Sequence, residues 1–520
     1  MKKKVLAKGI AGQDGAYLTK ILILLLSFTI SALQAQEKPI VKFEIEAQAI
    51  GTTNNVVPFW LRSNQYGSIP SDGVSGSFIG RARKEYDSTK VRSFDWGAGL
   101  EGRVNGGKNS KLLLIEGYAK VKAGIFQIKA GRTKDVMGLN GDSSLTSGNF
   151  SVSGNALGIP KVEISIPNYY SIPIWDGLIS FKGSFSHGWL GKTKILDTIR
   201  AIPPNPYKYG VPDRFPNTFY HQKSFYGRLG KPDWNLKLYG GFNHQVFWGN
   251  ERQSMGENFE LSTLETFFYV ATGKAYVEKT IPSSKIGNQL GSIDVGIEYD
   301  FKNITMLIYR QNLYDVGALS KLANISDGLN GISLKNKSYH VLSNGVQWKT
   351  LLLEFLYTKN QAGESWSKMT KSGDEDYYNN YYYTNGWSYN SLGLGTPFIT
   401  TKSAAKPGQA SIGSDYFINN RVVAFHAGIE GSIKKFEIIS KLSFSKNYGT
   451  FGTSPEGHST GIIRSPNTTN LFKTVNQFSA YLETHRSLSN GVSIGLAAAI
   501  DQGNLLYNSG GLVLKVSKSF

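Results

Sequence analysis

Histidine and serine are the residues of this chain that could carry hydrolytic or metal chemistry. A zinc site of the common kind needs histidines at H-x-x-x-H or H-E-x-x-H spacing, and the sequence contains no such pair. His221 and Ser224 are close along the chain, but a Ser–His nucleophile is defined by geometry, not by distance in sequence. Gly386-Trp387-Ser388 does not complete a G-x-S-x-G frame. We therefore predict no catalytic residue, no metal site and no cofactor.

The histidines then need another role. The seven are His187, His221, His244, His340, His426, His458 and His485. We assign His221 and His244 to hydrogen-bonded positions in the lumen of a barrel, with glycan contact and catalysis as the alternatives. The chain has no cysteine, which excludes disulfides and thiol chemistry.

An aromatic run at residues 377–389 is the most distinctive local feature. Tyr381, Tyr383, Trp387 and Tyr389 stand at alternating or near-alternating positions, so an extended backbone would place them on one face. Aromatic rings can stack on the faces of sugars, which suggests a platform for polysaccharide. The alternative is an interfacial girdle or loop packing, because tyrosine and tryptophan also gather at headgroup level.

Lysines on the polar faces of expected strands could line a cationic lumen. Lys120, Lys122 and Lys129 are the examples. Pairing with inward carboxylates such as Glu116 is the alternative, and it would leave the lumen without a net positive lining.

Period-two alternation runs through the chain after its N-terminal segment. Residues 42–49 alternate lysine, glutamate and glutamine with phenylalanine, isoleucine and alanine. Residues 115–123 alternate in the same way, turn near Gly124 and continue through residues 126–130, which is a hairpin signal. A soluble sandwich and a membrane barrel both alternate, with the apolar face inward in the first and outward in the second.

The C-terminus favours the membrane barrel. Apolar residues precede the terminal aromatic at alternating positions: Leu512, Leu514, Val516 and Phe520. An alternating last strand that ends on an aromatic resembles the signal read by the outer-membrane barrel-assembly machinery. Lys518 interrupts this alternation.

Residues 1–35 are predicted to be a secretory signal peptide with an unusually long n-region. Lys20 precedes a ten-residue apolar core, and Ala35 precedes a polar stretch. This core is too short for a membrane span, which needs about 20 residues. Gly9 to Leu18 resembles the nucleotide loop of GDP-mannose dehydratases, but the flanking strand and helix of such a site are missing. Residues 36–520 are predicted to form one barrel domain.

Composition agrees with many strands and few helices. Aromatics make up 12% of the 520 residues, charged residues 18%, and glycine occurs 58 times. The best helix begins at the capping box Ser262–Glu265 and ends at Gly273, and we expect it in a connecting segment inside the barrel. The net charge of +19, about +15 after residues 1–35, favours anionic partners. Export argues against nucleic acid and leaves acidic surface polysaccharide, outer-membrane lipid and lipopolysaccharide.

Several motifs, spread over nearly all of residues 36–520, resemble the Wzi family of outer-membrane capsule-assembly proteins. They are Val57–Gly67, Ala130–Arg132, Ser153–Ala156, Gly158–Lys161, Tyr220–Ser224, Gly241–Gly249, Tyr381–Tyr389 and Phe417–Arg421. The resemblance implies an 18-stranded barrel with helical elements closing the periplasmic side. It also implies a lectin-like, non-enzymatic role in holding exported capsular polysaccharide at the cell surface.

We therefore expect an all-β, transmembrane antiparallel barrel in the outer membrane of a Gram-negative bacterium, with a few short helices in connecting or plug segments. Two other functions stay open. A porin or substrate-specific channel would need an open lumen. An outer-membrane hydrolase would need a serine or aspartate nucleophile within hydrogen-bond reach of a histidine.

Overall fold

The structure is a computed structural model. It describes residues 41–87, 93–135, 137–140, 142, 144–196, 213–252, 259–278, 281–315, 318–362, 375–380, 382–411, 415–450, 452–454 and 471–520. The predicted signal peptide and the dehydratase-like residues 9–18 lie outside this set. No helix in the described part of the chain has the length and apolar character needed to cross a bilayer.

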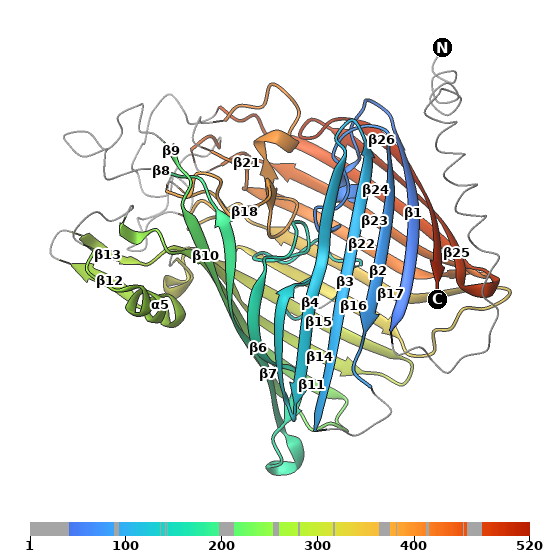
Figure 1. The fold of residues 1–520 in the computed structure, drawn as a ribbon, viewed down its shortest axis with the longest axis horizontal. Helices are drawn as coiled ribbons and strands as arrows, with labels where there is room; N and C mark the ends of the chain where they lie inside the picture. The colour runs from blue at the N-terminus through green and yellow to red at the C-terminus, as the bar shows by residue number, and fades with distance from the viewer. Residues whose placement is uncertain are drawn as a thin grey trace.

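Eighteen antiparallel strands form one sheet that closes on itself (Figure 1). Each strand pairs with the barrel strands before and after it, and the last strand pairs with the first along Glu44–Thr52. Closure removes sheet edges, as a strand-built membrane protein requires. The predicted 18-stranded barrel is confirmed. Its strands are β1 (Lys42–Thr52), β2 (Ser75–Lys84), β3 (Phe94–Gly107), β4 (Lys111–Ala123), β5 (Phe126–Arg132), β6 (Lys161–Ser171), β7 (Ile179–Lys192), β10 (Asn217–Leu229), β11 (Leu236–Trp248), β14 (Asn288–Asp300), β15 (Ile304–Tyr314), β16 (Gly328–Asn336), β17 (Val346–Tyr357), β22 (Val422–Ile433), β23 (Phe436–Asn447), β24 (Val475–Ser487), β25 (Val492–Gly503) and β26 (Ser509–Ser519).

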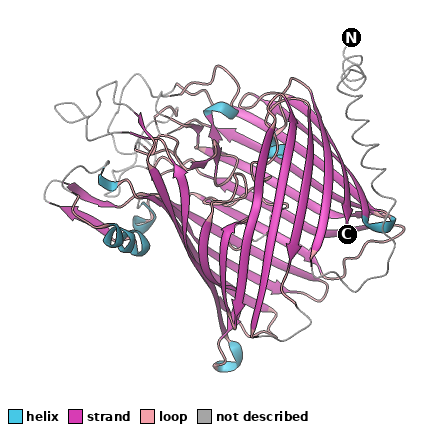
Figure 2. Cartoon of the chain, in the orientation of Figure 1, coloured by secondary structure: helices cyan, strands magenta, loops and turns pink. Residues whose placement is uncertain are grey.

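The remaining elements are short and belong to connections between barrel strands (Figure 2). The helices are α3 (Phe59–Arg62), α5 (Thr263–Thr272) and the single turns η1 (Trp175–Gly177), η3 (Ala318–Lys321), η4 (Lys402–Ala404) and η5 (Ser489–Gly491). Four two-stranded pairs join β8 (Ile195–Leu196) with β9 (Asp213–Arg214), β12 (Ala275–Glu278) with β13 (Ile281–Lys285), β18 (Ser388–Tyr389) with β19 (Leu392–Gly393), and β20 (Thr400–Thr401) with β21 (Phe417–Asn419).

Side chains alternate between an apolar outer face and a polar inner face. In β1, Phe43 is exposed on the outside, whereas Glu44 and Glu46 bind Arg81 of β2 on the inside. The outer face carries exposed apolar residues around the wall, among them Leu100, Ile128, Ile164, Phe225, Leu238, Val295, Ile332, Leu353, Phe425, Leu442, Leu482, Leu496 and Leu514. An apolar band outside a polar lumen is the pattern of a membrane barrel and the reverse of a soluble sandwich.

A β-bulge interrupts the expected alternation in β4. The register with β3 shifts between Glu101 and Gly102, so one residue of β4 is unpaired. As a result, both Ile115 and Glu116 are buried on the inside, where Ile115 packs against Leu157 and Glu116 binds Arg83. The predicted strict alternation over residues 115–123 is therefore wrong at Ile115 and Glu116, because sequence periodicity does not reveal an extra, unpaired residue.

The two ends of the barrel differ. The chain enters β1 and leaves β26 at the end with short turns, which we call the turn end. The longest connections lie at the opposite, loop end: residues 53–74, 133–160, 193–216, 249–287, 358–421 and 448–474. Bacterial outer-membrane barrels have short periplasmic turns and long extracellular loops, so the turn end corresponds to the periplasmic side.

The terminal residue supports a prediction about assembly. Phe520 follows β26 at the turn end, is exposed, and donates its N–H to the carbonyl of Phe43 at 2.9 Å. Leu512 and Leu514 are also exposed on the lipid face. We expect deletion of Phe520 to lower the amount of heat-modifiable protein in the outer membrane, whereas Phe520→Tyr should accumulate normally. Normal accumulation of the truncated chain would contradict this assignment.

Helix α5 confirms the sequence prediction and corrects its suggested position. The Ser262 hydroxyl accepts from the N–H of Glu265, the Glu265 carboxylate accepts from the N–H of Ser262, and Gly273 ends the helix with a positive φ of 68°. The helix lies outside the barrel wall, beside β10 (Figure 1), and not inside the lumen.

Candidate functional site

Segments of two connections from the loop end fold into the barrel. We call residues 137–159 and 375–401 together the lumen plug; positions 141, 143 and 381 of it are not described. Its side chains and backbone groups contact inward-facing residues of β11, β15, β17 and β22. A polar lumen is suited to holding such a segment, because buried backbone groups of an irregular chain need hydrogen-bond partners.

Glu354 of β17 is the main polar anchor of the plug. Its carboxylate accepts from the Asn140 amide at 3.0 Å, the Thr146 hydroxyl at 2.8 Å and the Ser147 N–H at 2.6 Å. The Tyr309 hydroxyl of β15 donates to the same carboxylate. One buried side chain thus receives three hydrogen bonds from the plug and one from the wall.

Other strands hold the plug in the same manner. The side-chain amide oxygen of Gln311 accepts from the N–H of Phe150 at 2.8 Å. The side-chain amide oxygen of Asn243 accepts from the Ser151 hydroxyl at 2.7 Å. His426 of β22 lies 2.6 Å from the Leu145 carbonyl oxygen through Nε2 and 2.7 Å from the Ser443 hydroxyl through Nδ1. The plug is therefore bound to several sides of the wall by hydrogen bonds.

Aromatic packing forms the centre of the plug. Trp387 is 0% exposed, stacks on Phe247 of β11 with ring centroids 4.2 Å apart, and donates its indole N–H to the Ser151 carbonyl at 2.8 Å. Tyr383 is also buried, and Tyr389 is half-buried. The prediction of an exposed sugar platform is wrong for Tyr383 and Trp387, because their rings pack against the barrel wall. Tyr381 lies outside the described residues.

Two small cavities lie between the plug and the wall. A cavity of about 20 Å³ is lined by Tyr66, Asp135, Lys161 and neighbouring plug residues, and one of about 10 Å³ lies beside Phe398. Each is about the size of one water molecule. The described plug is therefore packed closely against the wall.

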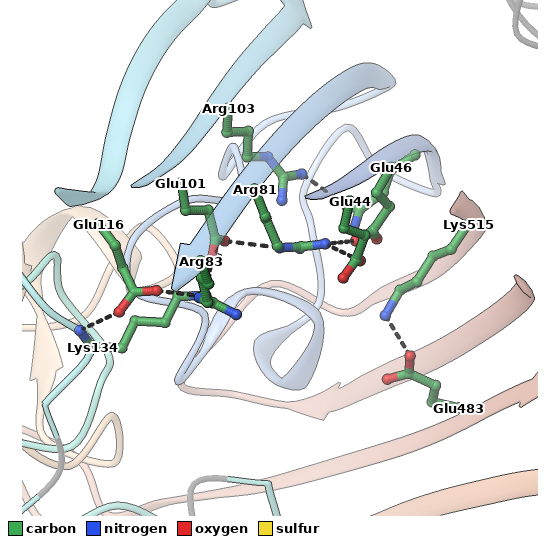
Figure 3. Close-up of polar contacts among 11 residues, drawn as sticks. Glu44, Glu46, Arg81, Arg83, Glu101, Arg103, Glu116, Lys134, Glu483 and Lys515 are labelled. Atoms are coloured by element: carbon green, nitrogen blue, oxygen red, sulfur yellow. Dashed lines mark hydrogen bonds and ion pairs between the residues drawn. The ribbon is translucent and has the colours of Figure 1, made fainter. Parts of the chain in front are cut away.

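A ladder of ion pairs lines the lumen on the turn side of the plug (Figure 3). Arg81 of β2 binds Glu44 and Glu46 at 2.6 Å each and Glu101 at 3.4 Å. Arg83 binds Glu101 at 2.8 Å and also contacts Glu116. Lys134, just before the plug, reaches Glu101 at 2.7 Å. We call Glu44, Glu46, Arg81, Arg83, Glu101, Glu116 and Lys134 the ion-pair ladder.

The ladder is partly open to solvent. The Arg83 side chain is 33% exposed and that of Lys134 is 27% exposed, although both belong to the inside of the barrel. A second pair, Lys515 with Glu483 at 2.5 Å, faces the lumen from β26 and β24. Water therefore reaches the turn-side half of the lumen, whereas the plug fills the loop-side half.

The lysines singled out from the sequence share this inner face. Lys120 binds Glu85 at 2.5 Å, and Lys129 lies 3.5 Å from both Asp135 and Glu163. Lys122 is exposed near the turn end. Glu116 binds Arg83 and is not the partner of these lysines. The lumen is thus lined by paired charges of both signs.

His221 and His244 are not lumen residues. Within β10, His221 shares the outer face with lipid-facing Phe225, and within β11 His244 shares the outer face with Phe242. His221 is covered by helix α5, whose Phe267 ring lies 5.7 Å from the His221 ring. His244 lies beside the ring of Tyr314, at 6.2 Å, and 3.0 Å from the side-chain oxygen of Gln289. The sequence motif could not show this, because a polar residue on a strand is normally expected on the polar face.

Ser224 and His221 do not form a Ser–His nucleophile. Ser224 and His221 are three residues apart on one strand and therefore point to opposite faces. Ser443 and His426 do form a pair, but both are buried, and the Ser443 hydroxyl also accepts from the Trp60 indole at 2.9 Å. No group of three or more His, Cys, Asp or Glu that could hold a metal occurs among the described residues.

A buried acidic group, Asp327, lies where the second plug segment begins. Its carboxylate accepts from the N–H groups of Asn360 and Gln361 at 2.9 and 2.7 Å and from the Tyr377 hydroxyl at 2.8 Å. Burial raises the pKa of Asp327 to about 7, and the hydrogen bonds from Gln361, Tyr377 and Asn360 oppose that rise. Nearby Glu375 binds the N–H of Ala318 and the Asn324 amide.

This pKa predicts how the docked plug responds to pH. The folded pKa lies above the ordinary aspartate value near 3.8, so the folded state binds more protons between those values. The contribution of Asp327 to the stability of the folded state is therefore fully present below about pH 4, and it is lost as the pH rises through about 7. We expect protease cleavage of the plug to be faster at pH 8 than at pH 5, after correction for intrinsic protease activity. Asp327→Asn should abolish this difference; an unchanged pH dependence in that variant would refute the assignment.

Comparisons with known proteins give a distant structural similarity only. No family model matches the chain, and no curated protein matches its sequence. The outer membrane protein OprD from Pseudomonas aeruginosa aligns at 10% identity with a TM-score of 0.42, covering 92% of each chain. OccAB4 from Acinetobacter baumannii aligns at 8% identity with a TM-score of 0.41, covering 92% of this chain and 97% of that one. A loop-deletion mutant of OmpT, an outer membrane protein of Vibrio cholerae, aligns at 7% identity with a TM-score of 0.33, covering 92% and 98%.

These similarities are too weak to carry a functional argument, and no family model supports the resemblance to the Wzi family, which stays a prediction. The architecture rests on the chain's own strand pairing and on the direction of its side chains. A closed 18-stranded sheet with an apolar exterior and a polar, charged lumen satisfies the physical requirements for spanning a membrane with strands. The chain is an outer-membrane β-barrel.

Proposed function

We propose that this barrel is a substrate-specific outer-membrane channel that the lumen plug holds closed in the conformation described above. The observation that carries the proposal is the ion-pair ladder. Its seven charged side chains line a solvent-accessible part of the lumen. The last of them, Lys134, lies three residues before the plug begins.

The contacts of the plug favour a gate that can open over a permanently closed core. The plug is held by hydrogen bonds to Glu354, Gln311 and Asn243 and by aromatic packing, and no disulfide ties it to the wall, because the chain has no cysteine. Contacts of this kind can be exchanged for water or for a ligand. Rings and rows of charged side chains set selectivity in known channel architectures, so the ladder is the part of the lumen that we expect to select the solute.

The test is ion selectivity in planar bilayers, measured as a reversal potential across a salt gradient. Arg83→Gln removes one ladder cation and leaves Glu116 with fewer partners, so we expect the open-state selectivity to shift toward cations. Lys349→Gln is the matched control, because Lys349 binds Glu430 near the turn end, away from the plug. Because the plug holds the wild type closed, both variants are measured in the Glu354→Ala background, which removes the main anchor of the plug. An identical reversal potential with and without Arg83→Gln in that background would remove the ladder from the conduction path.

A second candidate is polysaccharide binding at the cell surface, as the resemblance to the Wzi family implies. The closely packed plug favours it, since a surface-binding protein needs no open lumen. It predicts that the folded protein binds purified capsular polysaccharide and that neither wild type nor plug-released variants conduct ions. Binding would have to use surface residues other than Trp387 and Tyr383, which are buried.

A further inference from the structure

Helix α5 and the β12–β13 hairpin cover polar residues on the outside of the barrel. The outer faces of β7, β10, β11 and β14 carry His187, His221, Lys223, His244 and Gln289 near the loop end. Polar or charged side chains at lipid-facing positions are destabilising within the bilayer. The connection between β11 and β14 folds back over this patch, where His221, His244 and Gln289 are buried and His187 and Lys223 are half-buried.

The cover is attached by polar and aromatic contacts. The Lys223 ammonium donates to the Ala271 carbonyl in the last turn of α5, where a cation also complements the helix dipole. Among the covered wall residues, His244 Nε2 lies 3.0 Å from the side-chain amide oxygen of Gln289. Phe267 packs edge-on against His187 and His221, with ring centroids 5.7 Å apart in each pair. Helix α5 is therefore a fixed part of the outer wall.

The face of α5 that points away from the barrel is apolar. Thr266 and Val270 are buried against the wall, whereas Leu264 is 66% exposed and Phe268 is 57% exposed. At 100° per residue, Phe268 lies opposite the buried face and Leu264 lies beside it. Two large apolar side chains are thus presented outward on a helix of ten residues.

This apolar face is continuous with the lipid-facing belt of the barrel. Phe185 of β7 belongs to the belt, being 41% exposed, and its ring lies 6.2 Å from that of Phe267. Phe267 in turn lies 6.2 Å from Phe268. Around the helix axis the order is Phe267, Leu264, Phe268, and then the exposed polar residues Thr272 and Glu265. One side of the helix therefore meets the belt and the other side is polar.

We infer that α5 lies in the outer-leaflet interface and binds lipid acyl chains through Leu264 and Phe268. A short amphipathic helix with one apolar face and one polar face has the physical form of an interfacial anchor. Lys274, directly after the helix, is exposed and lies 4.7 Å above the ring of Tyr269, a position suited to an anionic headgroup. This inference concerns the outer surface and does not depend on whether the barrel conducts.

The natural absence of cysteine allows a direct test with single spin labels. Leu264→Cys and Phe268→Cys are labelled in protein reconstituted in phosphatidylcholine and phosphatidylglycerol vesicles. Thr272→Cys, on the polar side of the same helix, is the matched control, and Phe225→Cys reports a known lipid-facing position. Collisions with oxygen, which concentrates in the bilayer, are compared with collisions with a water-soluble nickel complex.

We expect labels at 264 and 268 to resemble the label at 225, with oxygen preferred several-fold over nickel, and the label at 272 to prefer nickel. Preference for nickel at 264 and 268 would show that this face meets water and would overturn the inference. Labels shielded from both reagents would also overturn it, because the face would then be covered by a second copy of the barrel or by another protein.

Discussion

Replacing Glu354 with alanine is expected to release the first plug segment and raise the conductance of the barrel. The change leaves three plug donors without their partner: the Asn140 amide, the Thr146 hydroxyl and the Ser147 N–H. Each buried donor left unpaired costs roughly 1–3 kcal/mol, so the docked state should lose several kcal/mol. Since about 1.4 kcal/mol is a tenfold change in an equilibrium, the undocked fraction should rise at least tenfold.

The control for this variant is Glu430→Ala. Glu430 is also a wall carboxylate, but its partner is Lys349 and it lies nearer the turn end of β22. Plug release is measured as the rate of labelling of a cysteine placed at Ser147 in each background. Slow labelling in both the Glu354→Ala and Glu430→Ala backgrounds would show that Glu354 does not hold the plug.

Replacing Trp387 with alanine should have a similarly large effect on the second plug segment. The indole is fully buried, stacks on Phe247 and donates to the Ser151 carbonyl. Truncation of a buried tryptophan costs about 3–5 kcal/mol. This loss of free energy should destabilise the docked plug and leave the barrel folded, because Trp387 takes no part in barrel strand pairing.

Two readouts separate the plug from the wall. Limited proteolysis should cut the Trp387→Ala plug much faster than the wild-type plug, whereas heat-modifiable migration of the folded barrel should persist. Trp189→Ala is the matched control, because that tryptophan is half-exposed on the outer wall. Equal protection of the plug in both variants would mean that Trp387 contributes little to docking.

Much of the fold was predictable because membrane barrels impose period-two alternation on every strand. The pattern places Phe43 and Leu514 on the outer face, where both are exposed. It places their neighbours Glu44 and Val513 on the inner face, as the structure has them. The capping box at Ser262 and Glu265 is a local signal and gave helix α5 correctly. The bulge beside Glu101 was not predictable, because the extra residue depends on the pairing of two strands.

The candidate site was harder to predict, because its residues come from distant parts of the chain. Glu354 meets Thr146 and Ser147 across more than 200 positions, and no local pattern links them. The run at residues 377–389 was visible as unusual, but its composition suits a sugar platform, a girdle and a buried plug equally well. His221 was misplaced because its face of the strand is covered by α5, a tertiary contact that alternation does not encode.

The central claim is that the plug closes the conduction path, and a reversible cross-link tests it most directly. A Cβ placed on Gly428 of β22 would lie 2.9 Å from the Leu145 Cβ of the plug, and a disulfide joins Cβ atoms about 3.5–4.5 Å apart, so a small shift suffices. The measurement is planar-bilayer conductance of Glu354→Ala that also carries Leu145→Cys and Gly428→Cys. We predict high conductance under reducing conditions and its loss on oxidation, with low conductance in the wild type throughout. Conductance unchanged by a cross-link verified by mass spectrometry, or equal in the wild type and Glu354→Ala, would contradict the proposed gate.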